Sequence, residues 1–433
     1  MNIRINTSRT FLSIISFLLL TIELPADDLT LARVVIQEPI GIARSLEYVE
    51  IQLQLNPNIK GSDELNIIAE DHLSGERIVC QIAEQQDYEN EGISILNVIF
   101  PISIQADERK EYLLKRVKLK PIVNTNLKVS GGGLNLIIDN KFYSADLSMI
   151  NSSDGKNKNS GQLNELKIKM GFDKLLFRSE NRIHWAPNFQ RHGLENYSTI
   201  AGWESPNYYI LNSGSYLVST ARQDYAVNHP EILLTANYSF YEGLPYFKFF
   251  SSMKMESDIY LDLLRNDEMT MDSLYTNIAY QNNRGEIIDL PFSKRYKELE
   301  SNPIQNDAPW LCFYNEKEGY AFGSIRIKYD ITNDRGLESP TYQPHTKISD
   351  GANGGKYWNR RLINDHPTYV PKGSSYIEKN AYLVFKIGNE NKFSEILNWM
   401  NILRNPVNLI VLCMSSKGYG QSQQLFNRPF YSI

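Results

Sequence analysis

Cysteine is scarce in this chain of 433 residues, which contains only Cys80, Cys312 and Cys413. The three residues are far apart and show no CxxC spacing. Neither a disulfide scaffold nor a cysteine-based zinc site can therefore organise the fold. We expect the three thiols to behave as small buried hydrophobic groups.

An excess of basic residues is also lacking. The formal net charge is −5 and the isoelectric point is near 5.8, so no overall positive field exists to attract nucleic acid. We expect no nucleic-acid partner. The same balance speaks against a polyanionic ligand, unless lysine and arginine are concentrated in a groove that the average conceals.

Long apolar runs are absent beyond the N-terminus, where Arg4 and Arg9 precede an apolar stretch at residues 11–22. With the small residue Ala26 at its exit, this segment predicts a secretory signal peptide at residues 1–26. The apolar stretch is short for a membrane span, although a short anchor or a buried helix is the alternative. We expect a secreted or periplasmic protein with no stable membrane span after cleavage.

What the sequence does contain is a long series of short strand patterns. Residues 48–55 alternate strictly between apolar and polar side chains, and further short runs separated by turns follow. This pattern predicts a small N-terminal β-sandwich or barrel at residues 27–124. Strands then recur through residues 125–433, and only residues 391–403 show clear helical spacing. We expect an all-β chain whose second domain is a large β-supersandwich with one short C-terminal helix.

Two motifs suggest a family. The sequence YSFYEGLPYF at residues 238–247 looks like two long strands joined by a tight turn, and residues 308–311 (APWL) and 319–323 (GYAFG) look like a second pair. On these motifs the chain resembles secreted carbohydrate-active proteins with a galactose-mutarotase-like β-supersandwich, as in the β-domains of polysaccharide lyases and glycoside hydrolases. The resemblance implies a polysaccharide or oligosaccharide partner. It supplies no catalytic residue.

The first candidate cluster is acidic and spans residues 265–272. If this segment is extended, Asn266, Glu268 and Asp272 share one face; if it is helical, Glu268 and Asp272 still meet. Paired carboxylates suit acid–base catalysis at a glycosidic bond, and they also suit a hard cation such as Ca²⁺. The alternative is a solvated loop or a structural ion-pair network. No cofactor is otherwise expected.

The second candidate cluster contains Arg182, His184, Trp185, Arg191 and His192. Tryptophan stacks on sugar rings, arginine pairs with carboxylates and histidine transfers protons near neutral pH. The alternative is a structural loop in which the tryptophan fills the core.

The third candidate cluster contains His345 and the run Tyr357, Trp358, Asn359 and Arg360. These residue types can bind both a sugar ring and its carboxylate. The glycines that precede the run are equally typical of a turn without chemistry.

Three functional hypotheses follow, and the first is a polysaccharide lyase that acts on a uronate by β-elimination. Such an enzyme needs a group that neutralises the carboxylate, a base and an acid. We expect Arg191 or Arg360 to neutralise the carboxylate, His184 or His192 to be the base, and Tyr357 to be the acid.

The second hypothesis is a glycoside hydrolase that uses Glu268 with Asp267 or Asp272. The third is a glycan-binding protein without catalysis, in which Trp185 and Trp358 hold the sugar. All three hypotheses require the three clusters to converge on one open face of a large sheet.

Overall fold

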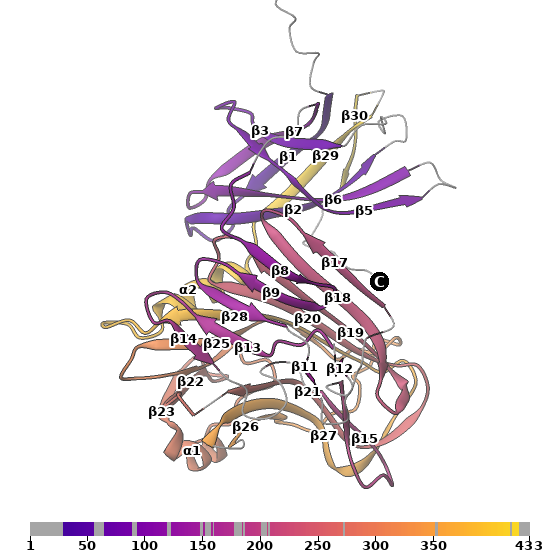
Figure 1. Cartoon of the computed structure of the whole chain (residues 1–433), viewed down its shortest axis with the longest axis vertical. Coiled ribbons are helices and arrows are strands. Elements are labelled where there is room, and N and C mark those ends of the chain that lie inside the picture. Colours follow the sequence, from indigo (N-terminus) through magenta and orange to yellow (C-terminus); the bar gives the residue numbers. More distant parts are fainter. Residues whose placement is uncertain are drawn as a thin grey trace, which may run out of the picture.

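Figure 1 shows the computed structural model of the protein. The structure describes residues 29–55, 65–88, 93–118, 123–147, 150–151, 157–158, 160–176, 184, 187–200, 206, 208–271, 273–350, 354–415 and 418–423. The expected signal peptide lies outside these residues. The fold is all-β, as predicted.

The N-terminal domain consists of two antiparallel sheets that enclose one apolar core. Apolar side chains at alternate positions fill this core. In β2 these include Val49, Ile51 and Leu53, which point inward. The larger sheet has the order β30 (Gly418–Gln423), β29 (Asn408–Ser415), β1 (Leu29–Gln37), β7 (Arg109–Val117), β3 (Asn66–Asp71) and β4 (Arg77–Val79). The smaller sheet has the order β2 (Arg44–Leu55), β6 (Ile93–Ile104) and β5 (Gln81–Tyr88).

The end of the chain returns to this first domain. Strand β29 pairs with β1 in the register Val34↔Val411, and Val407, Leu409 and Val411 enter the N-terminal core. In Figure 1 the yellow strands β29 and β30 lie among the indigo strands. We expected residues 125–433 to form the second domain alone, and the structure corrects that boundary.

The large domain contains three main sheets. The nine-stranded sheet has the order β17 (Tyr208–Ser213), β18 (Leu217–Ala226), β19 (His229–Tyr241), β20 (Tyr246–Met255), β28 (Ser375–Lys386), β25 (Tyr320–Asp330), β24 (Trp310–Tyr314), β22 (Asn277–Gln281) and β23 (Ile287–Pro291). One five-stranded sheet has the order β16 (Ser198–Thr199), β15 (Asn188–Arg191), β21 (Ile259–Met271), β27 (Lys356–Val370) and β26 (Thr346–Asp350). The other has the order β14 (Lys174–Leu176), β13 (Glu165–Ile168), β10 (Tyr143–Asp146), β9 (Asn135–Asp139) and β8 (Lys128–Gly132), and a separate pair joins β11 (Ile150–Asn151) to β12 (Asn157–Lys158).

One face of the nine-stranded sheet forms the main core with both five-stranded sheets. Phe247, Phe249 and Met253 of β20 point into this core, whereas the intervening Lys248 and Phe250 lie on the opposite face. The turn between β19 and β20 contains Gly243 at φ 66°, a backbone angle that favours glycine. The predicted pair of long strands joined by a tight turn is therefore confirmed.

The opposite face of the nine-stranded sheet packs against the N-terminal domain and helix α2 (Ser394–Arg404). Helix α2 confirms the helical spacing seen in the sequence. A 3₁₀ turn at Phe292–Lys294 and a second helix, α1 (Arg295–Ser301), were not predicted, because this short polar segment lacks an apolar stripe. Neither helix of the described part of the chain has the length and apolar character that a membrane crossing requires.

Candidate functional site

The structure brings parts of the three predicted clusters onto neighbouring strands of one five-stranded sheet. Asn188 of β15 pairs with Arg265 of β21, and Asn266 of β21 pairs with Arg360 of β27. Arg360 in turn pairs with Thr346 of β26. Segments distant in the sequence are thus adjacent in space.

The first and third clusters nevertheless bury most of their described side chains in the sandwich. Trp358 has no exposed surface and contacts Phe313 edge-on, with ring centroids 4.7 Å apart. Asn266 donates a hydrogen bond of 3.2 Å to Ser251 of the facing sheet, and Asn359 is also fully buried. A sugar cannot reach these three side chains, so the sugar-binding roles predicted for them are corrected to packing roles.

His184 is buried among aromatic rings and is corrected in the same way. Its Nδ1 atom lies 2.7 Å from the Tyr238 hydroxyl, and its ring centroid lies 4.5 Å from that of Phe249 and 4.3 Å from that of Tyr382. A histidine enclosed in this way cannot take a proton from a polysaccharide.

Replacing His184 by phenylalanine should lower the free energy of unfolding by about 1–3 kcal/mol, because the buried Tyr238 hydroxyl loses one of its hydrogen-bond partners. Urea denaturation of His184→Phe, of Tyr238→Phe and of the double variant would measure this coupling. A variant that keeps full stability but loses glycan binding would contradict the packing role.

Arg360 and His345 belong to a buried polar network. Arg360 donates to Glu378, with Nε and Oε2 3.2 Å apart, and to Thr346 Oγ1 at 2.5 Å. His345 Nε2 lies 2.7 Å from the Tyr329 hydroxyl. Burial, reinforced by the nearby Arg326, lowers the pKa of His345 to about 3, so the ring stays neutral. The roles predicted for Arg360 and His345 in substrate contact are corrected to structural ones.

Arg191 and His192 lie nearer the surface. Arg191 forms an ion pair with Glu231, and the exposed His192 lies 3.0 Å from Asp262 through Nδ1 and Oδ1. Tyr357 is half-buried near the other end of the same sheet, paired with Thr270, whereas Arg191 pairs with Leu261. The proposed neutraliser, base and acid therefore do not share one site.

The remaining candidates cannot be placed. Arg182, Trp185 and Asp272 lie outside the described residues, as do the side chains of Asp267 and Glu268. Asp267 and Glu268 belong to strand β21, so the acidic segment is extended, which was one of the two conformations considered. Among the described residues no three His, Cys, Asp or Glu side chains gather in a way that could hold a metal ion.

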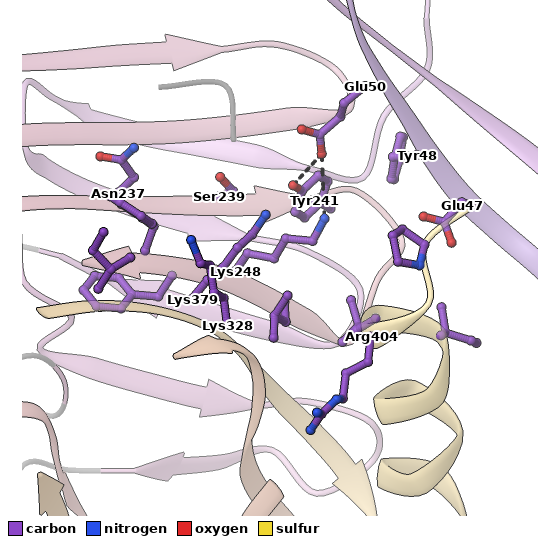
Figure 2. A pocket seen from close by; sticks show the side chains of 17 residues that line it. Glu47, Tyr48, Glu50, Asn237, Ser239, Tyr241, Lys248, Lys328, Lys379 and Arg404 are labelled. Atoms are coloured by element: carbon purple, nitrogen blue, oxygen red, sulfur yellow. Dashed lines mark hydrogen bonds and ion pairs between the residues drawn. The ribbon is translucent and has the colours of Figure 1, made fainter. Parts of the chain in front are cut away.

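A different site lies on the other face of the nine-stranded sheet, where that sheet meets the N-terminal domain and the end of α2. A pocket of about 510 Å³ opens there, a volume suited to one or two sugar rings. Its charged and tyrosine lining consists of Glu47, Tyr48, Glu50, Tyr241, Lys248, Lys328, Lys379 and Arg404. We call this site the basic pocket (Figure 2).

Three lysines from adjacent strands gather in the basic pocket. Lys328 of β25 pairs directly with Lys379 of β28, and Lys379 pairs on its other side with Phe250 of β20. Lys248 stands two residues from Phe250 on the same face and is therefore a diagonal neighbour of Lys379. Figure 2 shows the three lysine side chains close together. Like charges placed opposite each other destabilise a sheet, so this arrangement favours an anionic ligand.

A β-bulge creates the lysine pair. Arg326 and Lys328 are two residues apart in β25, so a regular strand would point both to the same face. The register shifts between them, and Arg326 faces Glu378 in the interior while Lys328 lines the pocket. Bulges commonly re-aim side chains in this way at functional sites.

Two carboxylates line the side of the pocket formed by β2. Glu50 accepts a hydrogen bond of 2.7 Å from the Tyr241 hydroxyl, and Lys248 Nζ lies 3.8 Å from its Oε1 atom. Glu47 pairs with Arg44 at 3.0 Å, yet burial raises the pKa of Glu47 against the opposing effect of that cation. Burial therefore shifts Glu47 toward its protonated form.

Sequence reasoning missed every residue of the basic pocket. A weak signal existed: Lys248 interrupts the aromatic run at residues 246–250. The lysines are more than 50 positions apart, however, and only the strand register unites them.

Comparisons with known proteins support the fold. No protein-family model matches the chain, and no curated protein matches its sequence. A protein in glycosyl hydrolase family 38 from Enterococcus faecalis has a similar structure, with a TM-score of 0.52 and 9% identity over 91% of this chain and 49% of its own. An alpha-mannosidase from the same organism also has a TM-score of 0.52, with 10% identity over 92% and 48% of the two chains. The chain thus spans about half the length of these β-rich neighbours.

Proposed function

We propose that the protein is a carbohydrate-active protein that binds a carboxylated glycan in the basic pocket. The observation that carries this proposal is the pair Lys328 and Lys379, directly opposite on adjacent strands, with Lys248 on the diagonal. In a chain with a net charge of −5, such a concentration of cations favours an anionic ligand. The expected signal peptide fits a glycan outside the cytoplasm.

We propose β-elimination at a bound uronate as the reaction. Elimination needs the carboxylate neutralised so that the neighbouring ring proton becomes acidic, and ammonium groups supply that charge. Lys248, Lys328 and Arg404 take the neutralising role first expected of Arg191 or Arg360. The pocket is partly open to solvent, so a chain of sugars can place one residue inside it while the rest of the chain lies outside.

Hydrolysis is the second candidate, because Glu47 and Glu50 differ in their surroundings. Glu47 has a raised pKa, whereas Glu50 accepts from Tyr241 and faces Lys248. A pair of carboxyl groups, one of which has a raised pKa, is the arrangement that glycosidases use. The structural neighbours named above are titled as a glycosyl hydrolase and a mannosidase.

A panel of polysaccharides separates these functions. Purified protein is incubated with polygalacturonate, alginate and hyaluronan, and with neutral mannan and galactan, while ultraviolet absorbance and reducing ends are followed together. We expect binding to the uronate polymers and an absorbance rise that matches the new reducing ends. Reducing ends without absorbance would indicate hydrolysis, and binding restricted to the neutral polymers would refute the proposal.

A further inference from the structure

We infer that Lys379 is the group that removes the ring proton from a uronate glycan bound in the basic pocket. The inference rests on the function proposed above and names the reactive side chain within that site. It differs from the initial expectation, in which a histidine served as base.

The position of Lys379 distinguishes it from the other basic residues of the pocket. Lys328 is 56% exposed at its side chain and lies 3.0 Å from Asp330, and Lys248 lies 3.8 Å from Glu50. Lys379 sits between these two lysines on the central strand β28 and is half-buried. Among the described residues it makes no ion pair within 4.0 Å, and the charge of Glu50 acts on its amine only from a longer distance.

This environment makes it easier for the amine of Lys379 to lose its proton. Burial lowers the pKa of Lys379 to about 8; the positive charges of Lys248 and Lys328 add to this effect, and the carboxylate of Glu50 opposes it. A base with a pKa near the working pH combines a useful neutral fraction with proton affinity. Lysines with depressed pKa values are frequent bases in proteins.

Lys379 alone can carry out both proton transfers of the elimination. The neutral Lys379 amine takes the proton from the ring carbon next to the carboxylate, while Lys248 and Lys328 stabilise the charge on that carboxylate. The carbon–oxygen bond to the next sugar breaks, and a carbon–carbon double bond forms in the ring. The new Lys379 ammonium then gives its proton to the departing oxygen, so no other reactant is required.

A specific pH dependence follows. The neutral fraction of Lys379 grows as the pH rises through about 8, so elimination should accelerate over that range. Binding should weaken over the same range, because the pocket loses positive charge. The charged or titratable groups that line the pocket around Lys379 are Lys248 on β20, Lys328 on β25, Glu47, Tyr48 and Glu50 on β2, Tyr241 on β19 and Arg404 at the end of α2.

The test compares Lys379→Arg with the exposed control Lys128→Arg. Arginine keeps the positive charge but cannot be deprotonated in a protein. Lys379→Arg should bind oligogalacturonate within about fivefold of the wild-type affinity, whereas elimination should fall by about 10²–10⁴-fold, the usual contribution of a positioned base. Lys128→Arg should change neither quantity.

A second measurement needs no substrate. Lysines of the whole protein are reductively methylated with ¹³C, and the signal lost in Lys379→Arg is followed by nuclear magnetic resonance against pH. We expect a midpoint near 8, and a midpoint at the ordinary value of 10.5 would overturn the inference.

The outcomes separate the inference from the proposed function. If Lys379→Arg eliminates at the wild-type rate, or if the wild type binds uronates without eliminating them, the inference fails and the binding function stands. If the wild type binds no uronate, the proposed function itself fails.

Discussion

Replacing Glu378 by glutamine is expected to lower the free energy of unfolding by about 3–5 kcal/mol, as breaking a buried ion pair does. Glu378 Oε2 lies 3.0 Å from Arg326 Nη1 and 3.2 Å from Arg360 Nε, and all three side chains are buried. Glutamine keeps the size but removes the charge, so two guanidinium groups would remain in the interior without an anion. Urea denaturation followed by tryptophan fluorescence measures the loss.

The matched control is Glu318→Gln. Glu318 forms a 2.9 Å ion pair with Lys174, but its side chain is 46% exposed, so the loss should stay under about 1 kcal/mol. Equal losses in the two variants would contradict the role of Glu378 as the anion that holds the two sheets together. The same outcome would mean that Arg360 is available to bind a glycan.

Neutralising the three pocket lysines should lower the affinity for oligogalacturonate by at least about a hundredfold. The variant carries Lys248→Gln, Lys328→Gln and Lys379→Gln, and each hydrogen bond to a charged group contributes about 1.5–3 kcal/mol. The fold should not suffer, because the substitutions remove repulsion between Lys328 and Lys379. Titration calorimetry at fixed salt concentration measures the affinity, and thermal melting measures the stability.

The control for this variant changes the net charge equally at exposed positions, with Lys128→Gln, Lys317→Gln and Lys372→Gln. Its affinity should stay close to that of the wild type. Equal weakening in both variants would mean that the overall charge, and not the basic pocket, attracts the glycan.

Much of the fold could be predicted because alternation reports which strands are half-buried. The tight turn at Gly243 between β19 and β20 and the apolar stripe of α2 were both visible in the sequence. The pairing of strand β29 with β1 was missed, because a local sequence pattern does not show with which distant strand a segment pairs. Helix α1 was missed since it is short and mostly polar, and one of its contacts is the Arg295–Asp350 ion pair.

The candidate site was harder to predict. Alternation of residue types distinguishes the two faces of a strand, but it does not show which face is accessible to a ligand. Trp358 and Arg360 lie in a run rich in sugar-binding residue types, yet the sheet turns both toward the interior. In contrast, Lys328 reaches the pocket only because a bulge follows Arg326. A break in strand register is not visible in residue types.

The most direct test of the account compares one oligosaccharide in two forms. Oligogalacturonate and the same oligosaccharide with its carboxylates reduced to alcohols are titrated into the wild-type protein and into the triple lysine variant. The account predicts that only the carboxylated form binds the wild type and that this binding disappears in the variant. Equal affinity for the two forms, or undiminished binding in the variant, would contradict it.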